Sequence, residues 1–79
     1  MEIKVLGTGC AKCRQLEQIV IEAIKDMEVK PTVVKEEDIT RIMSYGVMRT
    51  PALVINEKLV LSGRVPSVKE VTELIEKNK

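Results

Sequence analysis

The sequence predicts an α/β fold with the element order β-α-β-α-β-β-α. Three features lead to it: short runs of β-branched residues, longer segments with helical spacing of apolar residues, and Gly or Pro at the junctions. The 79 residues fit one domain, spanning 1–79, and 44% of them are apolar, dominated by Ile, Val and Leu. We therefore expect a single small domain with a real hydrophobic core.

The first half of the chain predicts a strand, a long helix and a second strand. Ile3–Leu6 is typical of a short strand, and the Gly7-Thr8-Gly9 segment ends it. From Cys10 to about Met27 the pattern is helical. The apolar residues recur at three- and four-residue steps: Leu16, Ile19, Val20, Ala23, Ile24 and Met27. Pro31–Val34 is the second β-rich run, with Pro31 at its entry, where a missing donor is tolerated.

A short second helix is expected to start near Glu36–Asp38. Its predicted buried face consists of Ile39, Ile42 and Met43, and Gly46 stands where a C-terminal cap would. The acidic residues 36–38 either cap this helix or form a solvated loop, and the sequence leaves both readings open.

The last third predicts a β-hairpin followed by a capped helix. Thr50-Pro51 introduces a third strand, Ala52–Ile55, and Leu59–Leu61 forms a fourth. Asn56-Glu57-Lys58 separates the two strands, which is hairpin length. Ser67 and Glu70 make a capping box at the start of the terminal helix. The apolar side of that helix consists of Val68, Val71, Leu74 and Ile75.

Composition argues against several classes of function. Thirteen basic and twelve acidic residues give a net charge of +1, so no large field of one sign attracts nucleic acid or anionic lipid. Tyr45 is the one aromatic residue, which leaves almost no ring on which bases could stack. The chain starts with a strand-like run in place of a signal peptide, and no apolar stretch approaches the roughly 20 residues that span a bilayer. We expect a cytoplasmic monomer that binds neither nucleic acid nor membrane.

Cys10 and Cys13 are the residues most clearly suited to chemistry. Helical register places Cys13 on the apolar face, whereas Cys10 lies at or before the first helical residue. Unpaired backbone N–H groups and the helix dipole stabilise an anion at that end and so lower a thiol pKa. Lys12 adds a positive charge beside the pair. The two cysteines are therefore unequal, as a nucleophile and a resolving thiol must be.

Three other interpretations of the cysteine pair compete with redox exchange. Structural zinc needs about four ligands, and the chain has no His and no second Cys pair, so we expect no metal site of that kind. The two cysteines could be small buried apolar residues that have this spacing by chance, but a C-x-x-C motif after a strand and a Gly-rich turn is too specific for that interpretation. The serious alternative is a Cu(I) or soft-metal carrier, since two thiolates also suit Cu(I).

Cys10-Ala11-Lys12-Cys13 after a first strand, with Thr50-Pro51 before a third, resembles the thioredoxin-like superfamily. The similarity covers nearly the whole chain and is greatest to the small, glutaredoxin-sized redox-active disulfide proteins. It implies a four-stranded mixed sheet with three helices and a cis proline at Pro51 that faces the dithiol. It also implies that Cys10 is the attacking thiol, Cys13 the resolving thiol and Thr50-Pro51 the edge on which substrates dock.

The chain departs from the larger families at several positions. Gly9, Ala11 and Lys12 stand where thioredoxins have Trp before, and Gly-Pro between, the cysteines. Lys4 falls in the stretch where thioredoxins carry a buried acid, and residues 62–66 lack the Gly-Gly and acidic patch with which glutaredoxins bind glutathione. Copper chaperones have a similar C-x-x-C loop. Their order ends on a strand, however, and they carry a Met before the first Cys.

The resemblance implies a thiol–disulfide oxidoreductase, a protein-disulfide reductase of thioredoxin or glutaredoxin type. Its partners would be protein disulfides and a separate reductase, and its cycle needs no cofactor. Because Pro51 lacks an N–H but leaves flanking backbone groups free, an extended segment of a partner could pair there in strand fashion. We expect Tyr45 to be a packing residue, Met48 a filler of a gap in the core, and Arg49 and Arg64 solvated surface charges.

Overall fold

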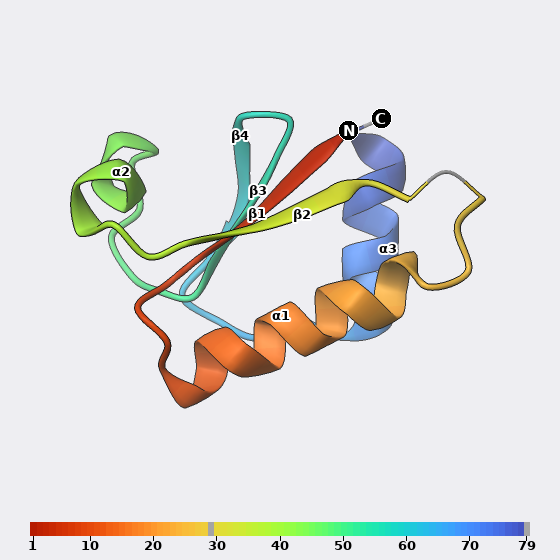
Figure 1. Cartoon of the computed structure of the whole chain (residues 1–79), viewed down its shortest axis with the longest axis horizontal. Helices are drawn as coiled ribbons and strands as arrows, with labels where there is room; N and C mark the ends of the chain where they lie inside the picture. The colour runs from red at the N-terminus through yellow and green to blue at the C-terminus, as the bar shows by residue number, and fades with distance from the viewer. Residues whose placement is uncertain (29, 79) are drawn as a thin grey trace.

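The computed structural model describes residues 1–28 and 30–78, and it has the element order predicted from the sequence (Figure 1). The elements are β1 (Glu2–Leu6), α1 (Ala11–Ile24), β2 (Thr32–Glu36), α2 (Ile39–Ser44), β3 (Ala52–Ile55), β4 (Lys58–Ser62) and α3 (Val68–Lys77). No helix within the described ranges is long and apolar enough to cross a membrane.

The four strands form one mixed sheet in the order β2-β1-β3-β4. β1 pairs with β2 in parallel and with β3 in antiparallel, and β3 pairs with β4 in antiparallel. The register places Leu6 opposite Ala52, so the residues that follow β1 lie beside those that precede β3. This pairing brings two segments about forty residues apart to the same end of the sheet.

Each face of the sheet carries its own apolar core, because successive side chains of a strand point to opposite faces. The larger core lies under α1 and α3, which Figure 1 shows together on one side of the sheet. It contains Ile3, Val5, Leu16, Val20, Ile24, Leu53, Ile55, Leu61, Val71 and Ile75. The smaller core, on the side of α2, contains Leu6, Ile42, Val47, Ala52 and Val54.

Helix α1 ends at Ile24, earlier than the predicted end at about Met27. The Lys25 N–H donates to the Glu22 carbonyl and the Met27 N–H to the Ile24 carbonyl. These three-residue steps tighten the last turn, as helix ends often do. Met27 still packs against the larger core, which explains why its spacing looked helical.

Helix α2 has an acidic N-cap, which is one of the two readings that the sequence left open, but only one of the three residues predicted for its buried face is buried. The Asp38 carboxylate accepts a hydrogen bond from the Thr40 N–H at 2.8 Å, so Asp38 is the N-cap. Gly46 follows the C-cap with a φ of 82°, the left-handed conformation expected there. Ile42 is buried, whereas Ile39 and Met43 are 62% and 65% exposed. A helix of fewer than two turns lays little more than one side chain on the sheet.

The hairpin connection is tighter than predicted, since Lys58 already belongs to β4. Asn56 and Glu57 have φ values of 49° and 68°, and both central residues of a type I′ turn need positive φ. At the start of α3, the Ser67 hydroxyl accepts from the Glu70 N–H at 3.1 Å, as the capping box predicts. The Glu70 carboxylate, however, binds the Arg64 guanidinium rather than the Ser67 backbone.

Candidate active site

Cys10 and Cys13 form a disulfide across the start of α1, with their Cα atoms 5.0 Å apart. Cys10 is the N-cap of the helix and is exposed. Cys13 is 5% exposed and lies in register with the buried residues of α1. The unequal burial of the two sulfur-bearing residues is the inequality that helical register predicted.

The Cys10 sulfur occupies the place of a capping oxygen. It accepts a hydrogen bond from the Cys13 N–H at 3.2 Å, and the Cys10 carbonyl accepts from the Arg14 N–H at 3.0 Å. Once the disulfide is reduced, the same N–H and the dipole of a 14-residue helix favour negative charge on Cys10. Lys12 lies between the cysteines on the first turn and is exposed to solvent.

Gly7 lies where the start of α1 approaches β1 and the segment before β3. A Cβ atom at this position would overlap the Cys13 sulfur, and it would lie 4.0 Å from the Thr50 Cβ. The absence of a side chain therefore lets β1, α1 and the segment before β3 approach one another. The sequence indicated Gly7 only as a strand breaker, because the close approach depends on residues far along the chain.

Thr50 and Pro51 lie beside this junction, and the peptide bond between them is cis. Thr50 is exposed, whereas Pro51 is less than 2% exposed. The Pro51 carbonyl accepts a hydrogen bond from the Gly63 N–H at 2.9 Å. Of the two residues, Thr50 is the one that is open to solvent.

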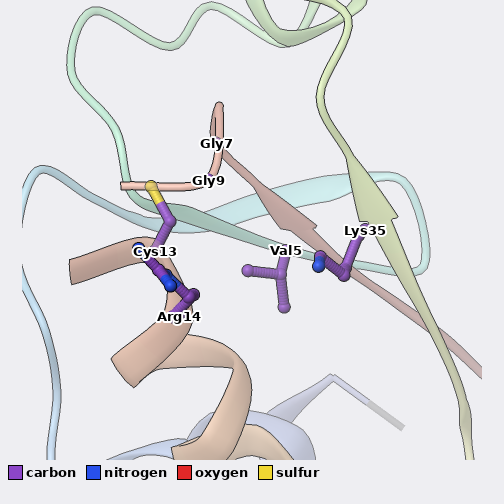
Figure 2. Close-up of a pocket in the computed structure, with 6 residues that line it drawn as sticks. All are labelled: Val5, Gly7, Gly9, Cys13, Arg14 and Lys35. Atoms are coloured by element: carbon purple, nitrogen blue, oxygen red, sulfur yellow. The ribbon is translucent and has the colours of Figure 1, made fainter. Parts of the chain in front are cut away.

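A small cavity of about 10 Å³, close to the space that one water molecule needs, lies beside Cys13 (Figure 2). Its lining consists of Val5, Gly7, Gly9, Cys13, Arg14 and Lys35. Figure 2 shows the Cys13 sulfur directed toward the Gly7–Gly9 segment, with Lys35 reaching in from β2. Lys35 also forms an ion pair with Glu17 of α1, with 3.8 Å between Nζ and Oε2. Spacing along the sequence did not reveal that Lys35 lies near the cysteines.

Lys4 has no part in this cavity, because it points to the opposite face of the sheet. Its ammonium donates hydrogen bonds to the Tyr45 hydroxyl at 2.7 Å and to the Glu57 carboxylate at 3.0 Å. The residue of β1 that faces the cysteines is the apolar Val5. Residues 1–28 and 30–78 contain no cluster of three or more His, Cys, Asp or Glu side chains that could hold a metal ion.

Together, a mixed α/β sheet and a C-x-x-C disulfide at the start of the first helix define a dithiol–disulfide exchange protein. Comparison with known proteins agrees. The family described as "Thioredoxin domain" matches residues 1–76, and the chain belongs to this family.

Two archaeal relatives extend over most of the chain. A thioredoxin of Methanothermobacter thermautotrophicus is 32% identical over 75 residues, which cover 95% of this chain and 97% of the relative. A thioredoxin of Methanocaldococcus jannaschii is 34% identical over 71 residues, which cover 90% of this chain and 81% of the relative. With the Cys10–Cys13 disulfide, this membership makes the chain a thiol–disulfide oxidoreductase.

Proposed function

We propose that Cys10 is the attacking thiol and Cys13 the resolving thiol in the reduction of disulfides in partner proteins. The observation that carries this assignment is the unequal exposure of the pair, with Cys10 open at the helix cap and Cys13 5% exposed. A partner disulfide can reach only the exposed sulfur. The disulfide between the buried Cys13 and Cys10 supports a role for Cys13 in the second step.

The proposed cycle moves two electrons in two exchanges. The Cys10 thiolate attacks one sulfur of the partner disulfide, forms a mixed disulfide and releases the other partner sulfur as a thiolate. Cys13 then loses its proton and attacks the Cys10 sulfur. The internal disulfide forms, the second partner thiolate leaves, and the partner has gained the two electrons. A separate reductase restores the dithiol, and no step needs a cofactor.

We assign the docking contact to Thr50 rather than to the buried ring of Pro51. Thr50 is exposed and lies beside Gly7, and Pro51 has no N–H and has its carbonyl bound by Gly63. An extended segment of the partner would therefore pair with the backbone around Thr50. Lys12, exposed between the cysteines, would add positive charge beside the Cys10 thiolate.

The proposal also covers the working form of the protein. Residues 1–79 would act as one domain, since both cores pack on the same sheet. It would act as a monomer in the cytoplasm, where reductases keep thiols reduced. Both cysteines of the sequence belong to the redox pair, which leaves none for a structural disulfide.

Single cysteine variants test these roles. Cys13→Ser should accumulate mixed disulfides with partner proteins, because the first attack proceeds and the second is blocked. Cys10→Ser should trap far less, since the remaining thiol is buried and lacks the helix cap. The measurement is a non-reducing gel of extract from cells that express each variant, with the double variant as control.

A Cu(I) titration distinguishes redox exchange from copper transport. In a copper carrier both thiolates are ligands, so either substitution should weaken Cu(I) binding to a similar degree. If neither variant traps a partner and the wild type binds Cu(I) tightly in competition with a chelator, the redox roles are wrong.

A further inference from the structure

A pocket of about 270 Å³ adjoins the redox site on the α2 side of the molecule. Its apolar lining consists of Ile39, Ile42, Met43, Val47 and Met48. The volume lies below the roughly 300–1,000 Å³ of typical small-molecule sites. One bulky side chain of another protein suits a pocket of this size better than a whole small molecule does.

Three residues of this lining contribute little to the core of the protein. Ile39, Met43 and Met48 are 62%, 65% and 93% exposed, although helical spacing predicted that Ile39 and Met43 would be buried and Met48 was expected to fill a gap. Met48 in particular fills no gap in the core. Exposed apolar side chains gathered around one pocket mark an interaction surface more often than isolated ones do. Methionine also adapts its shape to different partners.

The pocket lies next to the redox site, so the partner protein that reacts there is the molecule expected to cover it. Thr8, from the loop that carries Cys10, and Thr50, next to Pro51, form part of its wall. Thr8 is two residues from Cys10, and Thr50 lies beside Gly7, which adjoins the Cys13 sulfur. A protein whose disulfide reaches the Cys10 sulfur would therefore bring the residues on either side of its cysteine close to the mouth of the pocket.

A positive charge stands at the same rim. Arg49 lines the pocket and is exposed, and its side chain runs past Gly63. Within the described part of the chain, no acidic side chain forms an ion pair with Arg49. An acidic residue of a partner could bind there at low cost.

We propose that this pocket selects the partner, by binding a large apolar side chain close to the reacting cysteine, with an acidic neighbour facing Arg49. The proposal rests on the cysteine roles given above and adds a substrate class to them: disulfides in exposed segments that combine Leu-like and acidic residues. The apolar anchor supplies affinity and the charge supplies orientation.

Peptides that differ by one side chain test the pocket. Each carries one cysteine as a mixed disulfide with 2-mercaptoethanol, with Leu two residues before it, Leu two residues after it, or Ser at both places. The reduced wild type should react with one Leu peptide on the order of tenfold faster than with the Ser peptide. Met43→Gln/Met48→Gln should remove this preference. The control Ile21→Gln, at a position 47% exposed on α1, should keep it.

A small disulfide separates failure of docking from failure of the exchange itself. All three proteins should reduce 2-hydroxyethyl disulfide at the same rate, because it is too small to reach the pocket. If the wild type does not reduce it, the proposed function fails. If it does but shows no preference between the peptides, or if the methionine variant keeps the preference, the docking proposal is wrong.

Two further measurements test the contact with Arg49 and the alternative that a second copy of this chain covers the pocket. Two versions of the faster Leu peptide, one with Asp and one with Lys beside the Leu, differ in charge at this place. The wild type should react roughly two- to fivefold faster with the Asp version, and Arg49→Gln should abolish that difference. An equal rate for both peptides in the wild type would overturn the acidic part of the proposal. A wild type that sediments as a dimer, with a monomeric methionine variant, would show that a second copy of the chain covers the pocket.

Discussion

Gly7 lies where the cysteine helix, the first strand and the Thr50 segment meet, so we expect Gly7→Ala to be costly. The added Cβ would overlap the Cys13 sulfur. Overpacking of this kind costs about 1–3 kcal/mol of unfolding free energy. Urea denaturation in a reducing buffer measures the loss, and the exchange rate with a protein disulfide should fall as well.

A second variant shows whether the Cys13 sulfur is the cause. In a Cys13→Ala background the sulfur is gone, so Gly7→Ala should cost clearly less than in the wild type, all measured in the same reducing buffer. An equal cost in both backgrounds would mean that overlap with the Cys13 sulfur is not the reason that position 7 requires glycine.

The same contrast between the two cysteines predicts their order of alkylation. In the reduced protein, the Cys13 N–H and the helix end favour the thiolate of Cys10, whereas Cys13 is buried. Iodoacetamide at near-neutral pH should label Cys10 first, and peptide mass spectrometry over a time course identifies the site. Earlier labelling of Cys13 would reverse the assigned roles.

At the scale of an element, the apolar residues of α2 differ sharply in burial. Ile42 is 4% exposed and anchors the helix in the smaller core, so Ile42→Ala should cost about 2–5 kcal/mol. Ile39→Ala, in the same helix at a position 62% exposed, should change stability by less than about 0.5 kcal/mol. Thermal and urea unfolding of both variants check the pair. Similar losses would show that Ile39 belongs to the core.

Across the whole molecule, a polar network joins three separate elements on the α2 face. Lys4 of β1 binds Tyr45, which follows α2, and Glu57 of the β3–β4 hairpin, and the Tyr45 hydroxyl donates to Glu57 at 2.9 Å. Hydrogen bonds from Lys4 and then Tyr45 lower the pKa of Glu57 below its usual 4.5. Hydrogen bonds with Tyr45 and then Glu57 raise the pKa of Lys4.

These shifts predict an acid dependence of stability. Because the pKa of Glu57 is lower in the folded state, its stabilisation is present above the unfolded value and is lost as the pH falls through the folded value. Glu57→Gln should therefore be less stable than the wild type at neutral pH, and its unfolding free energy should fall less steeply between about pH 5 and pH 3. Urea unfolding at several pH values measures both slopes.

An exposed carboxyl elsewhere serves as the control for this network. Glu73→Gln, on the exposed side of α3, should leave the pH slope close to that of the wild type. Parallel curves for the wild type and Glu57→Gln would mean that the network does not contribute to stability. The raised pKa of Lys4 adds stability that is complete below the unfolded value and lost only at more alkaline pH.

The features that the sequence alone determined are those that depend on near neighbours. The element order, the cap at Ser67, and the contrast between an exposed Cys10 and a buried Cys13 follow from spacings of two to four residues. Helical register and cap chemistry act within one turn, so a single segment contains the information that decides them.

Only the tertiary structure decided which distant residues meet. The pairing of Leu6 with Ala52 brings Gly7 against Thr50, and the pairing of β1 with β2 brings Lys35 to the cavity beside Cys13. The tertiary structure also directs Lys4 away from the cysteines and leaves Ile39, Met43 and Met48 exposed around a pocket. Apolar spacing states which residues could be buried, but the area that the sheet offers to a six-residue helix determines which of them are.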